Sequence, residues 1–222
     1  MRTCVLTPLC NPDSMSYSEY TTALNRVYCL KHGYTYIVDG IPPLPERNIM
    51  WCKISTLKRH LPYYDYVLLL DADAFFINLE LRIESLLPLM DGKHMLFGTD
   101  KMTELHNIIP EGADERDWIN AGVILIENCE ITRQILYEWD SIPYQYPDYN
   151  QKNFHDQSAF QDILLPKYRE YIEVLPWPEC NRMNGHTGNF IRHLAGIPGP
   201  NRLAYLQEVF KHIHLVQLKN PA

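Results

Sequence analysis

Residues 66–73 join a continuous apolar run to two carboxylates, and this junction constrains the fold more than any other part of the sequence. The run Tyr66–Leu70 shows no polar alternation, which is typical of a parallel strand buried on both faces. Asp71 and Asp73 follow it directly. In open α/β sheets the carboxyl ends of the strands border the ligand-binding crevice. The junction therefore predicts a buried strand that delivers two acids to a binding site.

Two carboxylates separated only by Ala72 repel each other unless a cation lies between them. Asp71 and Asp73 are hard oxygen ligands suited to Mg²⁺ or Mn²⁺, and ligand type alone does not separate the two ions. The simpler interpretation is that the pair caps the next helix. However, the apolar segment Ala74–Ile77 follows, and burying charge without a partner is costly. We therefore expect a divalent-metal site.

The order of the predicted elements indicates an α/β fold with a doubly wound, mostly parallel sheet flanked by helices, followed by a smaller mixed region. The predicted strands are Arg2–Thr7, Tyr34–Val38, Tyr66–Leu70, His94–Gly98, Ile119–Glu127 and Tyr171–Leu175. The predicted helices are Ser14–His32, Met50–Leu61, Ile131–Trp139, Gln157–Leu165 and Arg202–His214. Between them, Pro143–Asn150 is expected to be an exposed, mobile Tyr/Pro-rich loop.

Composition favours one soluble globular domain, because the 222 residues are 46% hydrophobic and 21% charged and no linker divides them. A net charge of −7 disfavours a nucleic-acid partner, since no basic stripe replaces its counterions. Six cysteines without a Cys-x-x-Cys pair predict free thiols in a reducing, cytoplasmic setting. No segment is apolar and long enough to span a membrane. The same features would also fit a domain taken from a longer chain.

Five short motifs follow one another along the chain. They are Trp51-Cys52-Lys53, Asp71-Ala72-Asp73, Asn120-Ala121-Gly122, Asp156-Gln157-Ser158-Ala159 and His193-Leu194-Ala195-Gly196. In this order the chain resembles the GT-A-fold glycosyltransferases that use nucleotide sugars. Within them it is most similar to the yeast-type α-galactosyl/mannosyl and plant xylosyl transferase group, including a chlorella-virus domain of this type, and more distantly to glycogenin. The resemblance implies a GT-A fold over nearly the whole chain.

The resemblance also implies a metal-dependent, retaining transfer of a sugar from a UDP-sugar to a glycan or glycoconjugate hydroxyl. A single domain, 1–222, would then have a nucleotide-binding half (1–100) and a sugar- and acceptor-binding half (101–222). Asp71, Asp73 and His193 would hold the ion, with Mn²⁺ expected and Mg²⁺ as the alternative. Asp73 is the first choice for direct coordination, and Asp71 would ligate directly, through water, or would hydrogen-bond the ribose. His214 is a rival for the imidazole ligand, but Gly196 beside His193 permits a phosphate to approach closely.

Residues near the first two strands would contact the nucleoside. By resemblance, Thr7, Pro8 and Leu9 border the base and ribose. Tyr17 either stacks on the uracil or only packs the first helix. Asp39 either contacts the base or ribose or is a turn residue.

Other residues would contact the diphosphate and the sugar. Lys53 either points at the diphosphate, as the resemblance implies, or is a solvated helix lysine. The residues expected to face the sugar are Asn120, Ala121, Gly122, Asp156 and Gln157. Asp156 joins Asp71 and Asp73 as a predicted catalytic residue, with a helix N-cap as its simpler role. Arg202 lies too far beyond the last motif for a phosphate role to be expected.

Two other functions compete with the transferase. Haloacid-dehalogenase-type phosphohydrolases also place Asp-x-Asp after an apolar strand, with Asp71 as the nucleophile here. Phe75 and Phe76 then stand where those enzymes have small and Thr/Val residues. The other competitor is a non-catalytic module that binds a nucleotide sugar or glycan, with Tyr144–Tyr149 serving acceptor recognition.

Overall fold

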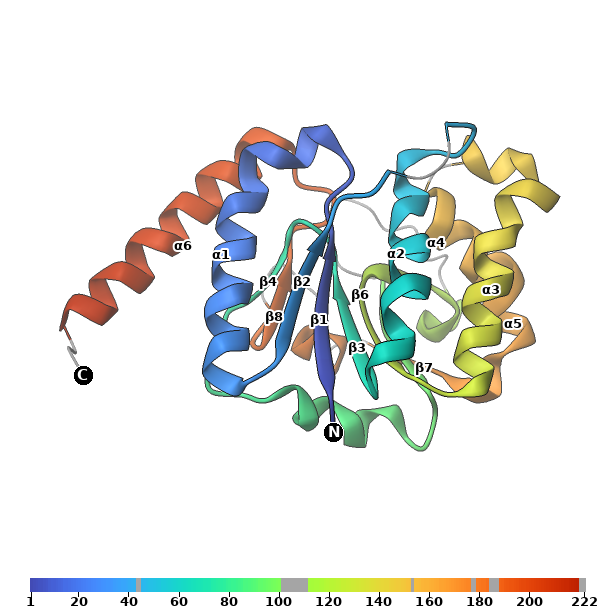
Figure 1. Cartoon of the computed structure of the whole chain (residues 1–222), viewed down its shortest axis with the longest axis horizontal. Coiled ribbons are helices and arrows are strands. Elements are labelled where there is room, and N and C mark those ends of the chain that lie inside the picture. The colour runs from blue at the N-terminus through green and yellow to red at the C-terminus, as the bar shows by residue number, and fades with distance from the viewer. Residues whose placement is uncertain (43–44, 101–111, 153, 177–178, 184–187, 220–222) are drawn as a thin grey trace.

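The computed structural model describes residues 1–42, 45–100, 112–152, 154–176, 179–183 and 188–219. Figure 1 shows a central sheet with helices on both sides. The strands are β1 (Thr3–Pro8), β2 (Thr35–Asp39), β3 (Tyr66–Leu70), β4 (Ala74–Phe76), β5 (Met95–Thr99), β6 (Ile119–Glu127), β7 (Ile172–Leu175) and β8 (Ile191–His193). The helices are α1 (Met15–His32), α2 (Cys52–His60), α3 (Glu130–Gln145), α4 (His155–Ala159), α5 (Leu165–Lys167) and α6 (Gly199–Lys219), with a π-helical turn (Phe160–Leu164) between α4 and α5.

The larger sheet of the described residues has six strands in the order β2-β1-β3-β6-β5-β7. Its neighbours are parallel except β6, which runs antiparallel to both β3 and β5. The predicted strands that form this sheet are found within one or two residues of their expected bounds. The predicted mostly parallel α/β architecture is therefore confirmed.

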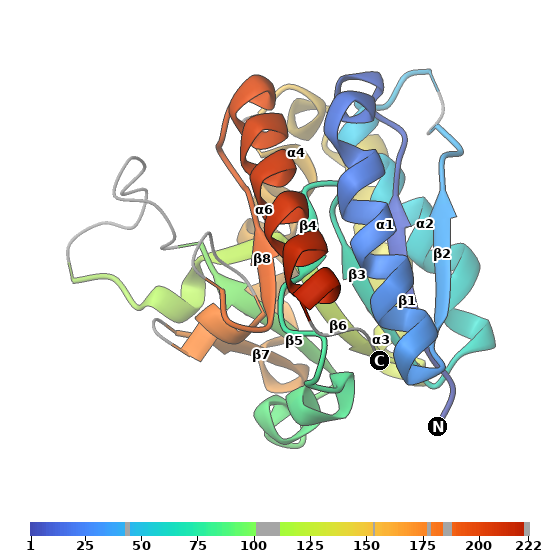
Figure 2. The same cartoon turned by 90° about the vertical axis from the view of Figure 1, so that its left-hand side faces the viewer.

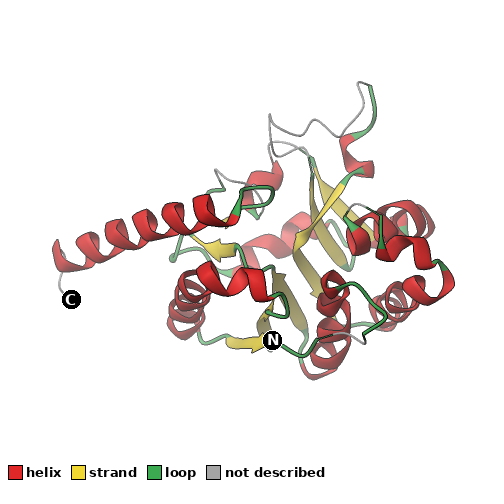
Figure 3. Ribbon diagram, turned by 90° about the horizontal axis from the view of Figure 1, so that it is seen from above, coloured by secondary structure: helices red, strands yellow, loops and turns green. Residues whose placement is uncertain are grey.

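The sheet is covered on both faces, as Figure 3 shows from above. Along β3, Val67 and Leu69 enter the core that α2 and α3 cover. Leu68 and Leu70 enter the core that α1 covers. All four are fully buried. Removing this much apolar surface from water, about 2 kcal/mol for each leucine, explains why the strand shows no polar alternation.

A second, two-stranded sheet pairs β4 with β8 in antiparallel fashion, and Ala74 lies opposite His193. Neither strand was predicted, because three residues carry no readable period. The Asn25 side chain of α1 fixes β4, since it donates to the Ala74 carbonyl (3.1 Å) and accepts from the Phe76 N–H (3.1 Å). Helix α6 packs beside α1 (Figure 2). Residues of both helices pack against Phe75 of β4, so the two helices together cover this small sheet.

The prediction of a loop from Pro143 to Asn150 is wrong, although residues 144–148 are exposed as expected. Helix α3 runs on to Gln145, and a 3₁₀ turn occupies Pro147–Asn150. Ile142 and Pro143 are buried, so packing continues the helix through a residue that usually ends one. Among the described helices, none combines the length and the apolarity needed to cross a bilayer.

Candidate functional site

A cavity of about 290 Å³ opens where β1 and β3 end. Most of the predicted site residues line its wall. They are Pro8, Tyr17, Lys53, Asp71, Ala72, Asp73, Asn120, Gly122, Asp156, Gln157, His193 and Gly196. Because they come from both halves of the chain, the fold collects in one place residues that are distant in the sequence.

Four predicted residues are not part of the cavity lining. Thr7 is buried in β1 and accepts a hydrogen bond from the Tyr36 hydroxyl (3.2 Å). The Leu9 N–H donates to the Asp39 carbonyl (2.9 Å). The Asp39 carboxylate lies 2.7 Å from His60 Nε2 and 3.0 Å from Arg59 Nε.

The fourth, Ala121, contributes only its backbone. Its N–H donates to Gln157 Oε1 (3.0 Å), and its carbonyl accepts from Lys53 Nζ (3.2 Å). Ala121 therefore positions two residues that do line the cavity.

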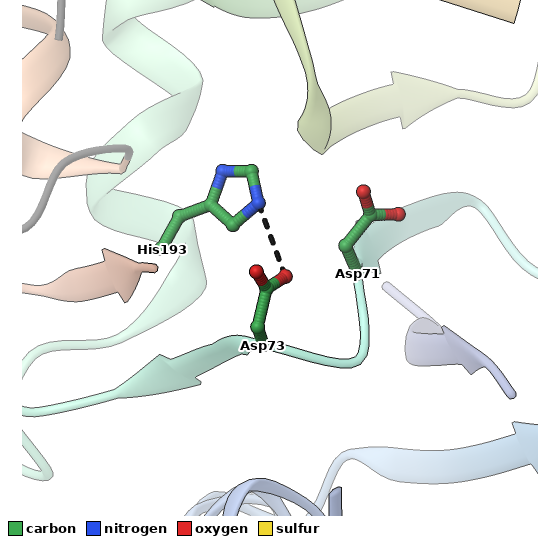
Figure 4. Close-up of side chains that lie close together, drawn as sticks. All are labelled: Asp71, Asp73 and His193. Carbon is green, nitrogen blue, oxygen red and sulfur yellow. Dashed lines mark ion pairs between the residues drawn. The ribbon is translucent and has the colours of Figure 1, made fainter. Parts of the chain in front are cut away.

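Asp71, Asp73 and His193 converge at the centre of the site (Figure 4). One ligand atom from each lies within 4.8 Å of the other two. His193 Nε2 is 3.2 Å from Asp73 Oδ1. Two carboxylate oxygens and one imidazole nitrogen form a donor set that suits Mn²⁺ or Mg²⁺. The side chain of the rival, His214, lies outside the described part of the chain.

Burial acts on the pKa values of Asp73 and His193, the two buried members of this cluster, in opposite directions. Burial alone would raise the pKa of Asp73, but His193 and Arg202 outweigh it and hold that pKa well below its usual range. Burial alone would lower the pKa of His193, but Asp73 outweighs it and raises that pKa. The cluster therefore favours an ionised carboxylate, as a cation site requires.

The backbone around the two aspartates is fixed on several sides. The Asp71 N–H donates to the Gly122 carbonyl (2.7 Å), and the Ala74 N–H donates to the Asp71 carbonyl (2.9 Å). The Thr21 hydroxyl of α1 donates to the Ala72 carbonyl (2.6 Å). Sequence reasoning did not identify Thr21, because a helix threonine gives no local sign of such a distant partner.

Gly122 was expected to make room for a ligand, and the structure places the His193 ring against it. A Cβ at residue 122 would lie 2.0 Å from His193 Cε1 and 2.5 Å from Nε2. We expect Gly122→Ala to displace the ring and to weaken Mn²⁺ binding roughly 10- to 100-fold in calorimetric titration. The control is Gly199→Ala, since a Cβ there meets nothing within 4 Å. Equal Mn²⁺ affinity in the two variants would contradict the prediction.

Lys53 lies buried between two carboxylates. Its Nζ is 3.0 Å from Asp71 Oδ2 and 3.5 Å from Asp156 Oδ2. Burial alone would lower the pKa of Lys53, but Asp156 and Asp71 outweigh it and hold that pKa above its ordinary value. The residue is only 5% exposed, so the interpretation of a solvated helix lysine is wrong.

The buried Oδ2 of Asp156 has an ion pair with Lys53 Nζ at 3.5 Å but accepts no hydrogen bond among the described residues. Burial raises the pKa of Asp156 to about 6, with Lys53 opposing the shift and Asp71 adding to it. An unsatisfied buried acceptor costs free energy unless a ligand donates to it. This oxygen is therefore suited to a hydroxyl that enters the cavity.

The chain just before Asp156 is strained. Phe154 and His155 have φ angles of 62° and 31°, a region that non-glycine residues rarely adopt. Helix α4 begins at His155 with Phe154 as its N-cap residue, so Asp156 lies inside the first turn and is not the cap. Trp139 Nε1 donates to the Asp156 carbonyl (2.9 Å) and fixes this turn. Such strain clusters at functional sites.

Sequence reasoning missed Asp100, which lines the cavity. It accepts hydrogen bonds from Asn120 Nδ2 (2.8 Å) and Gln157 Nε2 (3.1 Å). Asp100 follows β5 as Asp71 follows β3. An acid at the end of a predicted strand was therefore the available signal.

Arg202 also lines the cavity, although no phosphate role was expected for it. Helix α6 starts at Gly199, and its first turn places Arg202 at the cavity. Its Nη2 lies 3.0 Å from Asp73 Oδ2, and its Nη1 donates to the Tyr17 hydroxyl (3.1 Å). Tyr17 is 6% exposed and packs with Leu24 in the core under α6, so packing is one of its roles.

The charged groups of the lining do not balance. Among the residues that the structure describes, four carboxylates, those of Asp71, Asp73, Asp100 and Asp156, stand against two permanently charged bases, Lys53 and Arg202. Negative charges this close together destabilise one another. A divalent cation would offset the excess.

Comparisons with known proteins agree with this geometry. The galactosyl transferase GMA12/MNN10 family model matches residues 8–175. Galactomannan galactosyltransferase 1 of Cyamopsis tetragonoloba is 28% identical over 153 residues, which are 64% of this chain and 32% of the relative. The chain thus spans about a third of the length of the curated relatives it matches.

Solved structures agree on the fold. A glycosyltransferase involved in the glycosylation of the major capsid of PBCV-1 superposes with a TM-score of 0.73 at 17% identity, covering 94% of this chain and all of that one. A Drosophila β1,4-galactosyltransferase 7 mutant, in complex with manganese, UDP-Gal and xylobiose, gives a TM-score of 0.50 at 12% identity, covering 88% of this chain and 72% of that one. These likenesses confirm the predicted GT-A fold. Because the family pattern extends over most of the sequence, from the end of β1 to the end of β7, the chain belongs to the galactosyl transferase GMA12/MNN10 family.

Proposed function

We propose that this chain transfers a sugar from a UDP-sugar to a hydroxyl of a glycan or glycoconjugate, using a divalent cation bound by Asp71, Asp73 and His193. The observation that carries the proposal is the cluster of these three ligands within a cavity that also holds Lys53 and Arg202. When bound, such an ion supplies Lewis-acid stabilisation to a diphosphate leaving group. Mn²⁺ is the expected ion, as in the Drosophila neighbour of this fold.

Other residues of the cavity bind the phosphates and the sugar of the donor. Lys53 and Arg202 are cations at the cavity wall and orient the two phosphates. The open acceptor on Asp156, together with Asp100, Asn120 and Gln157, binds sugar hydroxyls. Arg202 contacts Asp73 at 3.0 Å, and a cation held by Asp73 would leave its guanidinium available to a phosphate.

We also propose that the reaction retains the anomeric configuration, an expectation that rests on the resemblance to retaining families. UDP-galactose is the first donor to test, because the family description and the Cyamopsis relative both name galactosyl transfer. NMR of the released or transferred sugar reads the configuration directly, and a β-configured first product from an α-configured donor would contradict retention.

Calorimetry with UDP tests the metal-dependent part of the proposal. We expect UDP to bind in the presence of MnCl₂ and to lose at least about 100-fold in affinity in excess chelator, because the ion offsets the negative charge that the diphosphate brings beside four carboxylates. Equal affinity with and without metal would overturn it. Slow release of UDP from UDP-galactose, with water as acceptor, separates an enzyme from a non-catalytic binding module.

A further inference from the structure

A half-exposed phenylalanine lines the cavity. Phe154 is 52% exposed and belongs to the cavity lining. Two more apolar side chains line the same cavity, those of Ile49 and Met50 in the 3₁₀ turn before α2. We call Ile49, Met50 and Phe154 the apolar wall. Apolar side chains beside a few polar groups are typical of a site that binds an organic ligand.

The fold brings the members of the apolar wall together from distant parts of the chain. The 3₁₀ turn Ile49–Trp51 contacts α4, which begins directly after Phe154. Just before the turn, the Asn48 N–H donates to Asn150 Oδ1 (3.2 Å), and Asn48 Oδ1 accepts from the Met50 N–H (3.0 Å). These contacts hold the segment that carries Met50 against the segment that leads to Phe154.

The backbone at Phe154 has a conformation that a smaller residue would adopt more easily. Its φ and ψ angles are 62° and 10°, in the left-handed region that favours glycine and asparagine. The Phe154 carbonyl accepts hydrogen bonds from the N–H groups of Gln157 (2.8 Å) and Ser158 (3.3 Å), which fixes this conformation. Because the ring is also half-exposed, folding alone gives no reason for a large aromatic side chain at this position.

The face of the Phe154 ring is uncovered, unlike the faces of other exposed rings. Lys58 Nζ lies 5.2 Å from the ring centroid of Tyr137, and Arg47 Cζ lies 5.3 Å from that of Tyr144. Among the residues that the structure describes, no other aromatic ring and no cation packs on Phe154 in this way. The ring face is therefore available to a ligand in the cavity.

A carboxylate that suits a sugar lies beside the apolar wall. Phe154 is two residues before Asp156, whose Oδ2 accepts no hydrogen bond among the described residues. A pyranose ring has C–H groups on its face, which suit the negative face of an aromatic ring, and hydroxyls at its edge, which donate to a carboxylate. A nucleobase would also stack, but the residues expected to border it, Pro8 and Tyr17, come from β1 and α1.

We propose that Phe154 is a specificity-determining residue that stacks on the face of a pyranose ring of the acceptor glycan, with Met50 and Ile49 extending the apolar contact. This inference rests on the proposed function, in which the donor sugar lies at Asp156. The acceptor ring then covers the exposed face of Phe154 at the cavity wall. Acceptors whose ring presents a polar face are bound more weakly, because stacking would remove that face from water.

Saturation-transfer NMR tests this contact without any transfer of sugar. The folded full chain in MgCl₂ is mixed with xylobiose, cellobiose, maltose or lactose at millimolar concentration, with and without UDP. Magnesium replaces manganese because Mn²⁺ broadens the signals. We expect the C–H protons on one ring face of at least one of these sugars to receive the strongest saturation. The Kd of that sugar should rise about tenfold in Phe154→Gly and stay unchanged in Phe154→Tyr, which keeps the ring.

The matched control is Tyr63→Ala, which removes an exposed ring outside the cavity. Tyr63 is 66% exposed and ends the 3₁₀ turn before β3, at the opposite end of that strand from the cavity. Its loss should leave the Kd of the sugar unchanged. Melting curves verify that the variants are folded. Phe154→Asn, which also suits the left-handed backbone, replaces Phe154→Gly if the glycine variant does not fold.

Three results would overturn the proposal. They are an equal Kd in the unmodified chain and in Phe154→Gly, a lack of saturation in all four sugars, and a UDP affinity that falls in calorimetry when the ring is removed. The last result would assign the ring to the nucleotide. UDP that does not bind the unmodified chain would count against the proposed function, while the measurement with sugar alone still decides whether Phe154 binds a pyranose.

Discussion

Asp73→Asn is expected to lower the release of UDP from UDP-galactose by about a thousandfold at saturating MnCl₂. The Asp73 carboxylate is a predicted ligand of the cation, and His193 and Arg202 both contact it. An amide of the same shape keeps a hydrogen-bond acceptor but removes the negative charge that a cation needs. The measurement is the initial rate of UDP release, together with calorimetry of Mn²⁺ binding.

The matched control for this variant is Asp148→Asn, which makes the same chemical change at an exposed position in the 3₁₀ turn after α3. It should leave the rate unchanged. Thermal melting of both variants separates lost chemistry from lost folding. A rate in Asp73→Asn within tenfold of the unmodified protein would show that this carboxylate does not anchor the ion.

Lys53→Met is expected to lower the free energy of unfolding by about 3–5 kcal/mol at pH 7.5, in the absence of metal. The substitution leaves Asp71 and Asp156 facing each other in a site where Lys53 was their buried partner. Chemical denaturation measures the difference. Lys58→Met is the control, because that lysine of the same helix is one-third exposed and its partner Asp140 keeps Arg47. Its loss should be about 1 kcal/mol or less.

The effect of Lys53→Met should also depend on pH. The pKa of Asp156 is raised to about 6 from an ordinary 3.8, so this group lowers stability above pH 6, and the loss fades as the pH falls toward 3.8. Without Lys53 the pKa of Asp156 rises further and the loss grows. The deficit of the variant should therefore be smaller at pH 5 than at pH 7.5. An equal deficit at both values would argue against charge as its cause.

The sequence predicts the parts of this molecule that local pattern determines. Strand β3 and the acids after it follow from an apolar run that ends in charge, and α1 follows from its start and its Gly33 stop. The β4–β8 sheet could not be predicted, because each strand has three residues and the pairing joins distant segments. The loop predicted at Pro143 is wrong for a different reason. Proline is a local signal that usually ends a helix, but the burial of Ile142 and Pro143 outweighs it and α3 continues.

The same division holds within the site. Asp71, Asp73 and His193 belong to recognisable motifs, so the sequence alone identifies the candidate ligands. The sequence does not identify Arg202 in this way, because residues 197–201 separate it from the last motif. Helix α6 places Arg202 3.0 Å from Asp73, and the spacing of residues along the sequence does not indicate this closeness in space.

Because β8 has only three residues, the position of the His193 imidazole is sensitive to the length of the chain before this strand. Successive residues of a strand point to opposite faces, so slippage by one place would put Arg192 or Leu194 opposite Ala74. An insertion upstream of β8 would then displace His193 from the proposed cation site while the large sheet stayed folded. Natural variants of this chain should therefore tolerate added residues upstream of β8 only when Ala74 remains paired with His193.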